Sequence, residues 1–146
     1  MRDEKLQIKL FEKSDISLMR EIIEDDEDTR KFMPERLAAW LDDPKNIAFI
    51  AVSDGKAVAL IEGYSLECLD DRLPRYFIYS VDVLPAYRGQ GVGKSLLAFV
   101  LEYTSGGRFS ESFVISDRGN IPACRLYEGL GGKNDYEDEV VFVWNY

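Results

Sequence analysis

The feature that most constrains the fold is residues 81–97, where an apolar stretch, a basic glycine-rich loop and an amphipathic stretch follow one another directly. The apolar residues before Pro85 predict a buried strand, and the spacing of apolar residues after Gly91 predicts a helix. Glycine at positions 89, 91 and 93 lets a ligand approach the main chain without meeting a Cβ atom. The segment therefore predicts a strand, a tight loop and a helix whose first N–H groups face the loop.

Amide groups at a helix N-terminus, beside Arg88 and Lys94, are typical of a phosphate or pyrophosphate site. A nucleotide P-loop is excluded because its first glycine would fall at Arg88, and a dinucleotide loop is excluded because the glycines read G-x-G-x-G. The pattern that matches is Q/R-x-x-G-x-G/A. The residues predicted to hold a phosphorylated cofactor are Arg88, Gly89, Gln90, Gly91, Val92, Gly93, Lys94 and Ser95.

Composition excludes several classes of function. The 146 residues include 18 Lys and Arg against 27 Asp and Glu, and the net charge of −9 argues against a nucleic-acid partner. Histidine is absent and the two cysteines match no metal pattern, so we expect no His-based triad, no metal and no disulfide framework. The charged first residues are not a signal peptide and no apolar run reaches membrane length, so we expect a cytoplasmic protein without a membrane partner.

Hydrophobic periodicity predicts a mixed α/β sheet in a single domain, residues 1–146. The predicted strands are residues 6–10, 47–52, 57–64, 76–83, 113–115 and 140–146. The predicted helices begin at Ser14 or Asp15, at Pro34, at Val92 and at Pro122. Asp54-Gly55 predicts a hairpin turn. Strict alternation along residues 76–83 would put Ile78, Ser80 and Asp82 on one face and Phe77, Tyr79, Val81 and Val83 on the other.

A second pattern lies on the last predicted helix, where Asn120, Ala123 and Tyr127 fall at i, i+3 and i+7 and share a face. Taken singly, these residues suit a cap, a packing alanine and a tyrosine at the edge of the core. Residues 120–131 also read N-x-x-A-x-x-x-Y-E-x-L-G. Together with the loop at residues 88–93, this pattern resembles the two signatures of the GCN5-related N-acetyltransferases, the GNAT family.

The resemblance extends over nearly the whole chain and is closest to the gentamicin-type aminoglycoside 3-N-acetyltransferases. The stretches that carry it are residues 36–44, 64–79 and 137–139. It implies a GNAT fold, a mostly antiparallel sheet with flanking helices that is splayed between the strand ending at Val83 and the strand at residues 113–116.

The resemblance also implies acetyl-CoA as the cofactor. Its pantetheine arm would bond to the main chain around Val81 and Val83. Asn120, Ala123 and Tyr127 would contact the cofactor as well, and Tyr127 would protonate the departing thiolate. A phenol suits this role because it keeps its proton at neutral pH.

Amine acetylation also needs a base and a group that polarises the thioester carbonyl. A backbone N–H near Val83 can do the second. For the base, Glu62 and Asp82 are equal candidates, directly or through ordered water. The residues predicted to bind the acceptor are Ser80, Asp70, Asp71, Asp138 and Glu139, with Glu137 as a further candidate; exposed loop charge explains each acidic residue equally well.

The sequence thus predicts an N-acetyltransferase that moves an acetyl group from acetyl-CoA to a primary amine of a small cationic acceptor, aminoglycoside-like or polyamine-like. Two alternatives stay open: a protein or peptide amine as the acceptor, and a non-catalytic acyl-CoA-binding regulatory module. The last predicted strand, rich in Val and Trp, is an edge that could pair across a homodimer.

Overall fold

The computed structural model describes residues 6–25, 30–134 and 139–146. The chain divides into two compact units, Met1–Ile115 and Ser116–Tyr146, and each is described by itself. The first unit holds the sheet and the glycine loop. Organisation of residues 1–146 as one domain stays a prediction.

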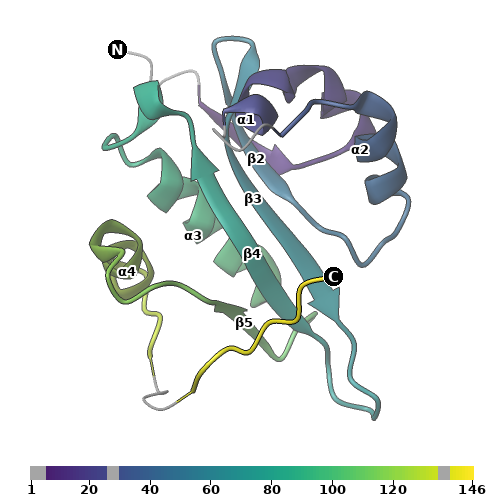
Figure 1. Cartoon of the computed structure of the whole chain (residues 1–146), viewed down its shortest axis with the longest axis vertical. Helices are drawn as coiled ribbons and strands as arrows, with labels where there is room; N and C mark the ends of the chain where they lie inside the picture. Colours follow the sequence, from purple (N-terminus) through teal and green to yellow (C-terminus); the bar gives the residue numbers. More distant parts are fainter. Residues whose placement is uncertain (1–5, 26–29, 135–138) are drawn as a thin grey trace. The chain divides into compact units, whose positions relative to one another are not determined.

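Five strands form one sheet in the order β1-β2-β3-β4-β5 (Figure 1). Neighbouring strands pair antiparallel, except that β4 and β5 are parallel. The prediction of a mixed, mostly antiparallel sheet is therefore confirmed. The strands are β1 Gln7–Leu10, β2 Phe49–Ser53, β3 Lys56–Leu66, β4 Arg75–Val83 and β5 Glu111–Val114.

The turn between β2 and β3 forms where the sequence predicts it. Asp54 and Gly55 both have positive φ, 55° and 76°. A two-residue hairpin turn needs this conformation, because its twist then matches the right-handed twist of the strands. Asp and Gly tolerate it better than other residues, so the dipeptide alone specifies the turn.

A β-bulge in β4 decides which side chains share a face with Glu62. Glu62 lies opposite Ser80, but Gly63 lies opposite Ile78, so Tyr79 is an extra residue in β4. The predicted strict alternation is wrong at this point, because a bulge of one residue reverses the faces that follow it. Residues in register share a face, which groups Leu60, Glu62 and Tyr64 with Asp82, Ser80 and Phe77.

Helices cover both faces of the sheet in the first unit (Figure 1). Helix α3 (Val92–Thr104) packs on one face. The 3-10 helix η2 (Lys13–Leu18), helix α1 (Arg20–Glu24) and helix α2 (Pro34–Leu41) cover the other. Helix α2 begins at Pro34 as predicted, since proline suits the first helical position.

The single helix predicted from Ser14 or Asp15 is wrong. The Asp15 carboxylate accepts hydrogen bonds from the Glu12 main-chain N–H and from Lys9 Nζ, both at 2.9 Å. The Glu12 side chain completes this capping box at the start of η2. The box holds a short 3-10 segment, and the α-helix proper begins only at Arg20.

Tyr76 is fully buried on the face of the sheet that α3 covers. Its hydroxyl donates to the Ile47 carbonyl at 2.6 Å, and its ring packs edge-on against Phe49 and Phe109. A Cβ atom on Gly63 would lie 2.1 Å from the Tyr76 hydroxyl oxygen. Position 63 therefore requires glycine for packing, directly beside the bulge.

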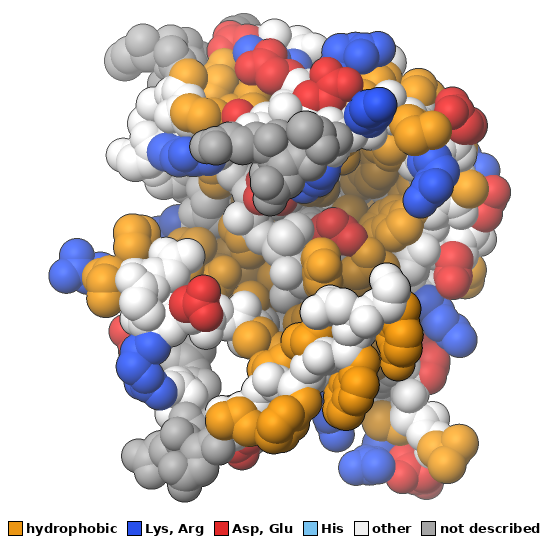
Figure 2. Space-filling view, viewed as in Figure 1, with side chains coloured by type: hydrophobic (Ala, Val, Ile, Leu, Met, Phe, Trp, Pro, Cys, Tyr) orange, Lys and Arg blue, Asp and Glu red, His pale blue; other side chains and the backbone are white. Residues whose placement is uncertain are grey.

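The second unit contains helix α4 (Ile121–Gly129). Residues 139–146 form no strand, so the strand predicted at residues 140–146 is wrong, and the edge expected to pair across a homodimer is absent with it. Their β-branched and aromatic side chains suit a strand, but a strand also needs a hydrogen-bonded neighbour, which the described residues do not supply. Val140, Phe142 and Trp144 are 70%, 75% and 73% exposed, and Figure 2 shows hydrophobic side chains of this segment at the surface.

Within residues 6–25, 30–134 and 139–146, no helix is long and apolar enough to cross a bilayer.

Candidate functional site

The glycine loop joins β4 to α3 through the short 3-10 helix η3 (Pro85–Tyr87). Gly89 and Gly91 have φ of 72° and 83°, a conformation that strains any residue with a Cβ atom. Open space lies in front of both residues, because a Cβ atom there would meet nothing within 4 Å. Gly91 is the N-cap of α3, so the first amides of the helix point toward this space. The predicted strand, glycine loop and helix are confirmed.

Arg88 connects the loop to the strand. Its Nε donates to the Val83 carbonyl at 2.9 Å, and its Nη2 lies 3.7 Å from Asp25 Oδ2. The guanidinium is therefore held beside the loop by two contacts, yet its side chain stays 61% exposed. Gln90 instead turns back, donating from Nε2 to the Ala86 carbonyl at 2.9 Å. Lys94 and Ser95 are exposed in the first turn of α3.

The sheet opens beside the loop. Strand β5 pairs with β4 only from Arg75 to Ile78, while β4 continues to Val83. The Leu84 N–H donates to Val58 in β3, and the Val83 carbonyl accepts from Arg88 outside the sheet. Because main-chain groups alternate in direction along a strand, Val81 and Val83 present N–H and C=O groups at the open edge.

Glu62 lies at the end of a hydrogen-bonded chain of side chains. The Tyr64 hydroxyl donates to Glu62 Oε2, and Trp40 Nε1 donates to the Tyr64 hydroxyl oxygen at 3.4 Å. Burial, followed by the hydrogen bond to Glu62, raises the pKa of Tyr64 to about 12. The Tyr64 hydroxyl therefore stays protonated at neutral pH and donates to one oxygen of the Glu62 carboxylate. The other carboxylate oxygen is left for a ligand.

Ser80 and Asp82 lie on the same face, in the strand next to Glu62. The Ser80 Oγ atom is buried and has no hydrogen-bond partner in the described structure, which is costly unless a ligand supplies one. Asp82 is engaged differently, because Arg30 Nη1 lies 4.0 Å from its Oδ2. The structure thus brings the predicted residues Glu62, Ser80 and Asp82 together.

A cavity of about 230 Å³ lies between α2 and this face of the sheet. Its walls are apolar side chains from the segment before η2, from α1, α2 and β3. Trp40 and Leu37 form the α2 side, and Glu62 and Arg36 are the only charged residues in the lining. Glu62 therefore faces an apolar chamber rather than bulk solvent alone.

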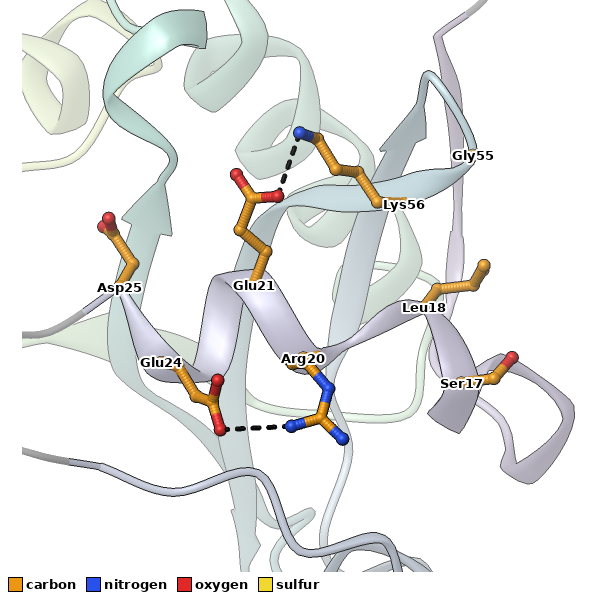
Figure 3. Close-up of a pocket in the computed structure, with 8 residues that line it drawn as sticks. All are labelled: Ser17, Leu18, Arg20, Glu21, Glu24, Asp25, Gly55 and Lys56. Carbon is orange, nitrogen blue, oxygen red and sulfur yellow. Dashed lines mark hydrogen bonds and ion pairs between the residues drawn. The ribbon is translucent and has the colours of Figure 1, made fainter.

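A wider, open cavity of about 570 Å³ lies between η2–α1 and the β2–β3 turn (Figure 3). Each of its charged side chains has an opposite charge nearby, and Asp25 pairs with Arg88 outside the lining. Glu21 accepts from Lys56 at 3.0 Å, and Glu24 accepts from Arg20 at 3.5 Å. These pairs leave no concentrated charge in the lining, so this cavity suits a ligand less well than the one at Glu62.

The structure does not bring the predicted residues Asp70 and Asp71 to Glu62. Asp70 and Asp71 are exposed in the turn after Leu66, which is about 13 Å along β3 from Glu62 at the usual rise per residue. Hydrogen bonds from Arg72 occupy the Asp70 carboxylate and lower its pKa. Glu139 is exposed in the second unit, and Glu137 and Asp138 lie outside the described residues.

In the second unit, the predicted cap of the last helix is present. Asn120 Oδ1 accepts from the Ala123 N–H at 3.2 Å, and Ile121–Gly129 follows as α4. Tyr127 lies two turns along the same helix. The cofactor contacts of these three residues, and the role of Tyr127 as proton donor, stay predictions.

Sequence reasoning missed Tyr64, Arg36 and Arg30 as members of the site. Tyr64 had a detectable signal, since it lies two residues from Glu62 in a strand and must share its face. Arg36 and Trp40 fall at i and i+4 in α2, which also places them on one face. For Arg30 no local signal exists, because only the tertiary structure brings it to Asp82.

Comparison with known proteins agrees with this geometry. The model of the acetyltransferase (GNAT) family matches residues 15–131. The chain is 30% identical over 95 residues to N-acetylaspartate synthetase of Xenopus tropicalis, a match that covers 65% of this chain and 34% of that protein. It thus spans about a third of the length of that relative.

Two solved structures show the same fold. An aminoglycoside acetyltransferase from an uncultured soil metagenomic sample, in complex with trehalose, superposes with a TM-score of 0.80 at 25% identity, covering 99% of this chain and 97% of that one. Aminoglycoside N-acetyltransferase AAC(6')-Iy in complex with CoA gives 0.75 at 20% identity, covering 96% and 94%. With the glycine loop, the open edge of β4 and the family match over residues 15–131, this chain belongs to the acetyltransferase (GNAT) family.

Proposed function

We propose that this acetyltransferase uses acetyl-CoA to acetylate the primary amine of a small acceptor that binds at Glu62. The observation that carries the proposal is the open edge of β4, where Val81 and Val83 present main-chain groups directly before the glycine loop. The pantetheine arm of CoA is an extended chain with amide groups, and it leads to a pyrophosphate. The amides can pair with the main chain at the edge of β4, and the pyrophosphate can bind the amides at the start of α3.

The residues present fit such a cofactor. The space in front of Gly89 and Gly91 admits a pyrophosphate against the amides of residues 89–94, and Arg88 and Lys94 supply two positive charges. Val81 would bond the pantetheine amides, and Val83 would keep its N–H for the acetyl carbonyl because its C=O already accepts from Arg88. When bound, acetyl-CoA supplies an acetyl group activated as a thioester.

Side chains on the face of β3 and β4 that carries Glu62 then remove a proton from the acceptor amine. Glu62 accepts a proton from the acceptor ammonium group, directly or through one water, because Tyr64 holds its carboxylate in place. We favour Glu62 over Asp82 because Arg30 already lies 4.0 Å from Asp82. The Val83 N–H polarises the acetyl carbonyl, and Tyr127 stays our proposed proton donor to the thiolate.

A small acceptor is favoured over a protein or peptide, because Glu62 lines a cavity of about 230 Å³ rather than an extended groove. The likeness to an aminoglycoside acetyltransferase in complex with sisomicin keeps aminoglycosides among the acceptors to be tested. Turnover on any amine would separate this proposal from a non-catalytic acyl-CoA-binding module.

The decisive experiment reverses the charge of Arg88. We expect Arg88→Glu to weaken CoA binding by at least about tenfold in a calorimetric titration, because a carboxylate would face the pyrophosphate. Lys45→Glu is the matched control: Lys45 is exposed in the turn before β2, and the same charge change there should leave CoA affinity unaltered. Equal CoA affinity of wild type and Arg88→Glu would remove the loop assignment.

A further inference from the structure

The cavity at Glu62 is poorly suited to a polycation. Apart from Glu62 and Arg36 its lining is apolar, and several wall residues, including Met19, Ala48 and Leu60, are almost completely buried. Each additional ammonium group of an aminoglycoside or polyamine would lose its hydrating water here and contact apolar side chains instead, which costs free energy. Arg36 would repel it as well. These contacts favour an acceptor with an apolar body.

The two charges in the lining have opposite sign. Glu62 keeps one carboxylate oxygen for a ligand. Arg36 makes no ion pair within the described residues, so its guanidinium is available to an anion at the α2 side of the cavity. A ligand with one ammonium group and one carboxylate matches this pair of charges.

The size of the cavity gives further information on the class of acceptor. Its 230 Å³ corresponds to about eight water volumes. Pockets for drug-sized ligands usually begin near 300 Å³. The space therefore suits an amino acid about as large as leucine or methionine.

We propose that the acceptor is a compact α-amino acid with an apolar side chain. Its ammonium group lies at Glu62, its carboxylate at Arg36, and its side chain against Trp40 and Leu37. This assignment rests on the proposed function. In the reaction, the ammonium nitrogen gives one proton to Glu62, and the resulting neutral amine bonds to the acetyl carbon. The nitrogen then loses its second proton to water, the carbon–sulfur bond breaks, and the thiolate sulfur takes a proton from water or from the proposed donor Tyr127.

A binding measurement tests the acceptor without requiring turnover. We expect wild type to bind L-leucine about tenfold more tightly than L-leucinamide in calorimetry, since only leucine offers a carboxylate to Arg36. Arg36→Gln should reduce this ratio to about one, and Arg36→Glu should reverse it. Lys45→Gln, which removes an exposed cation outside the cavity, should keep the wild-type ratio. Equal affinity of wild type and Arg36→Gln for leucine would overturn the assignment.

Turnover separates this inference from the proposed function. With acetyl-CoA present, the rate of thiol release should give leucine a higher kcat/KM than leucinamide, spermidine or sisomicin. A higher kcat/KM for spermidine or sisomicin would overturn the amino-acid acceptor and leave the acetyltransferase intact. Arg36-dependent leucine binding with no thiol release on any amine would support the binding site and refute the proposed function.

Discussion

Substituting Gly63 by alanine tests the packing that holds the bulge beside Glu62. The added Cβ atom would lie 2.1 Å from the Tyr76 hydroxyl oxygen and 2.3 Å from the ring carbon that bears it. The ring cannot turn aside freely, because Tyr76 is fully buried and packs against Phe49 and Phe109. The structure can accommodate alanine only by moving the ring or by opening the sheet.

The cost follows from the contacts that would be lost. Overpacking of a buried site usually costs about 1–3 kcal/mol. Separating the Tyr76 hydroxyl from the Ile47 carbonyl adds about 1 kcal/mol. We therefore expect Gly63→Ala to lower the free energy of unfolding by about 2–4 kcal/mol, and the Tm by about 6–12 °C.

Urea unfolding followed by circular dichroism measures this loss. Gly106→Ala is the matched control, because Gly106 has an ordinary backbone conformation and its added Cβ atom would make only a normal contact, 3.6 Å from the Tyr103 carbonyl oxygen. We expect the control to change stability by less than about 0.5 kcal/mol. If Gly63→Ala unfolds at the same urea concentration as wild type, Tyr76 does not constrain the bulge and the packing argument is refuted.

Three further predictions concern the chemistry of the site. Glu62→Gln should lower kcat at neutral pH by about 10²–10⁴-fold with CoA affinity unchanged, measured by thiol release and calorimetry; full activity would assign the base to Asp82. Tyr127→Phe should slow turnover more than it weakens CoA binding, and an unaltered rate would mean another proton donor. The third is a pH dependence. Because the pKa of Tyr64 is raised from 10.0 to about 12, its contribution to stability is complete below pH 10 and is lost as the pH rises to 12. Urea midpoints should fall over this range, and fall less in Tyr64→Phe; an equal fall in both proteins would contradict the linkage.

Several local features could be predicted from the sequence because short-range geometry decides them. The turn at Asp54-Gly55 needs two positive φ values, and the start of α2 needs only Pro34 at its first position. The cap at Asn120 likewise depends on a residue three positions away. The strand that was predicted at the end of the chain is wrong for a different reason. Residues 140–146 have strong strand propensity, but a strand exists only where another main chain pairs with it.

The sequence by itself determined that β4 runs into a glycine loop and that α3 begins there, because the conformations of Gly89 and Gly91 and the apolar spacing of the helix are local properties. Only the tertiary structure decided which side chains meet at the site. The bulge opposite Glu62 depends on the pairing of β3 with β4. The cavity that joins Glu62 to Arg36 depends on α2 packing over the sheet. Both arise from contacts between residues far apart in the chain, and no spacing along the sequence encodes them.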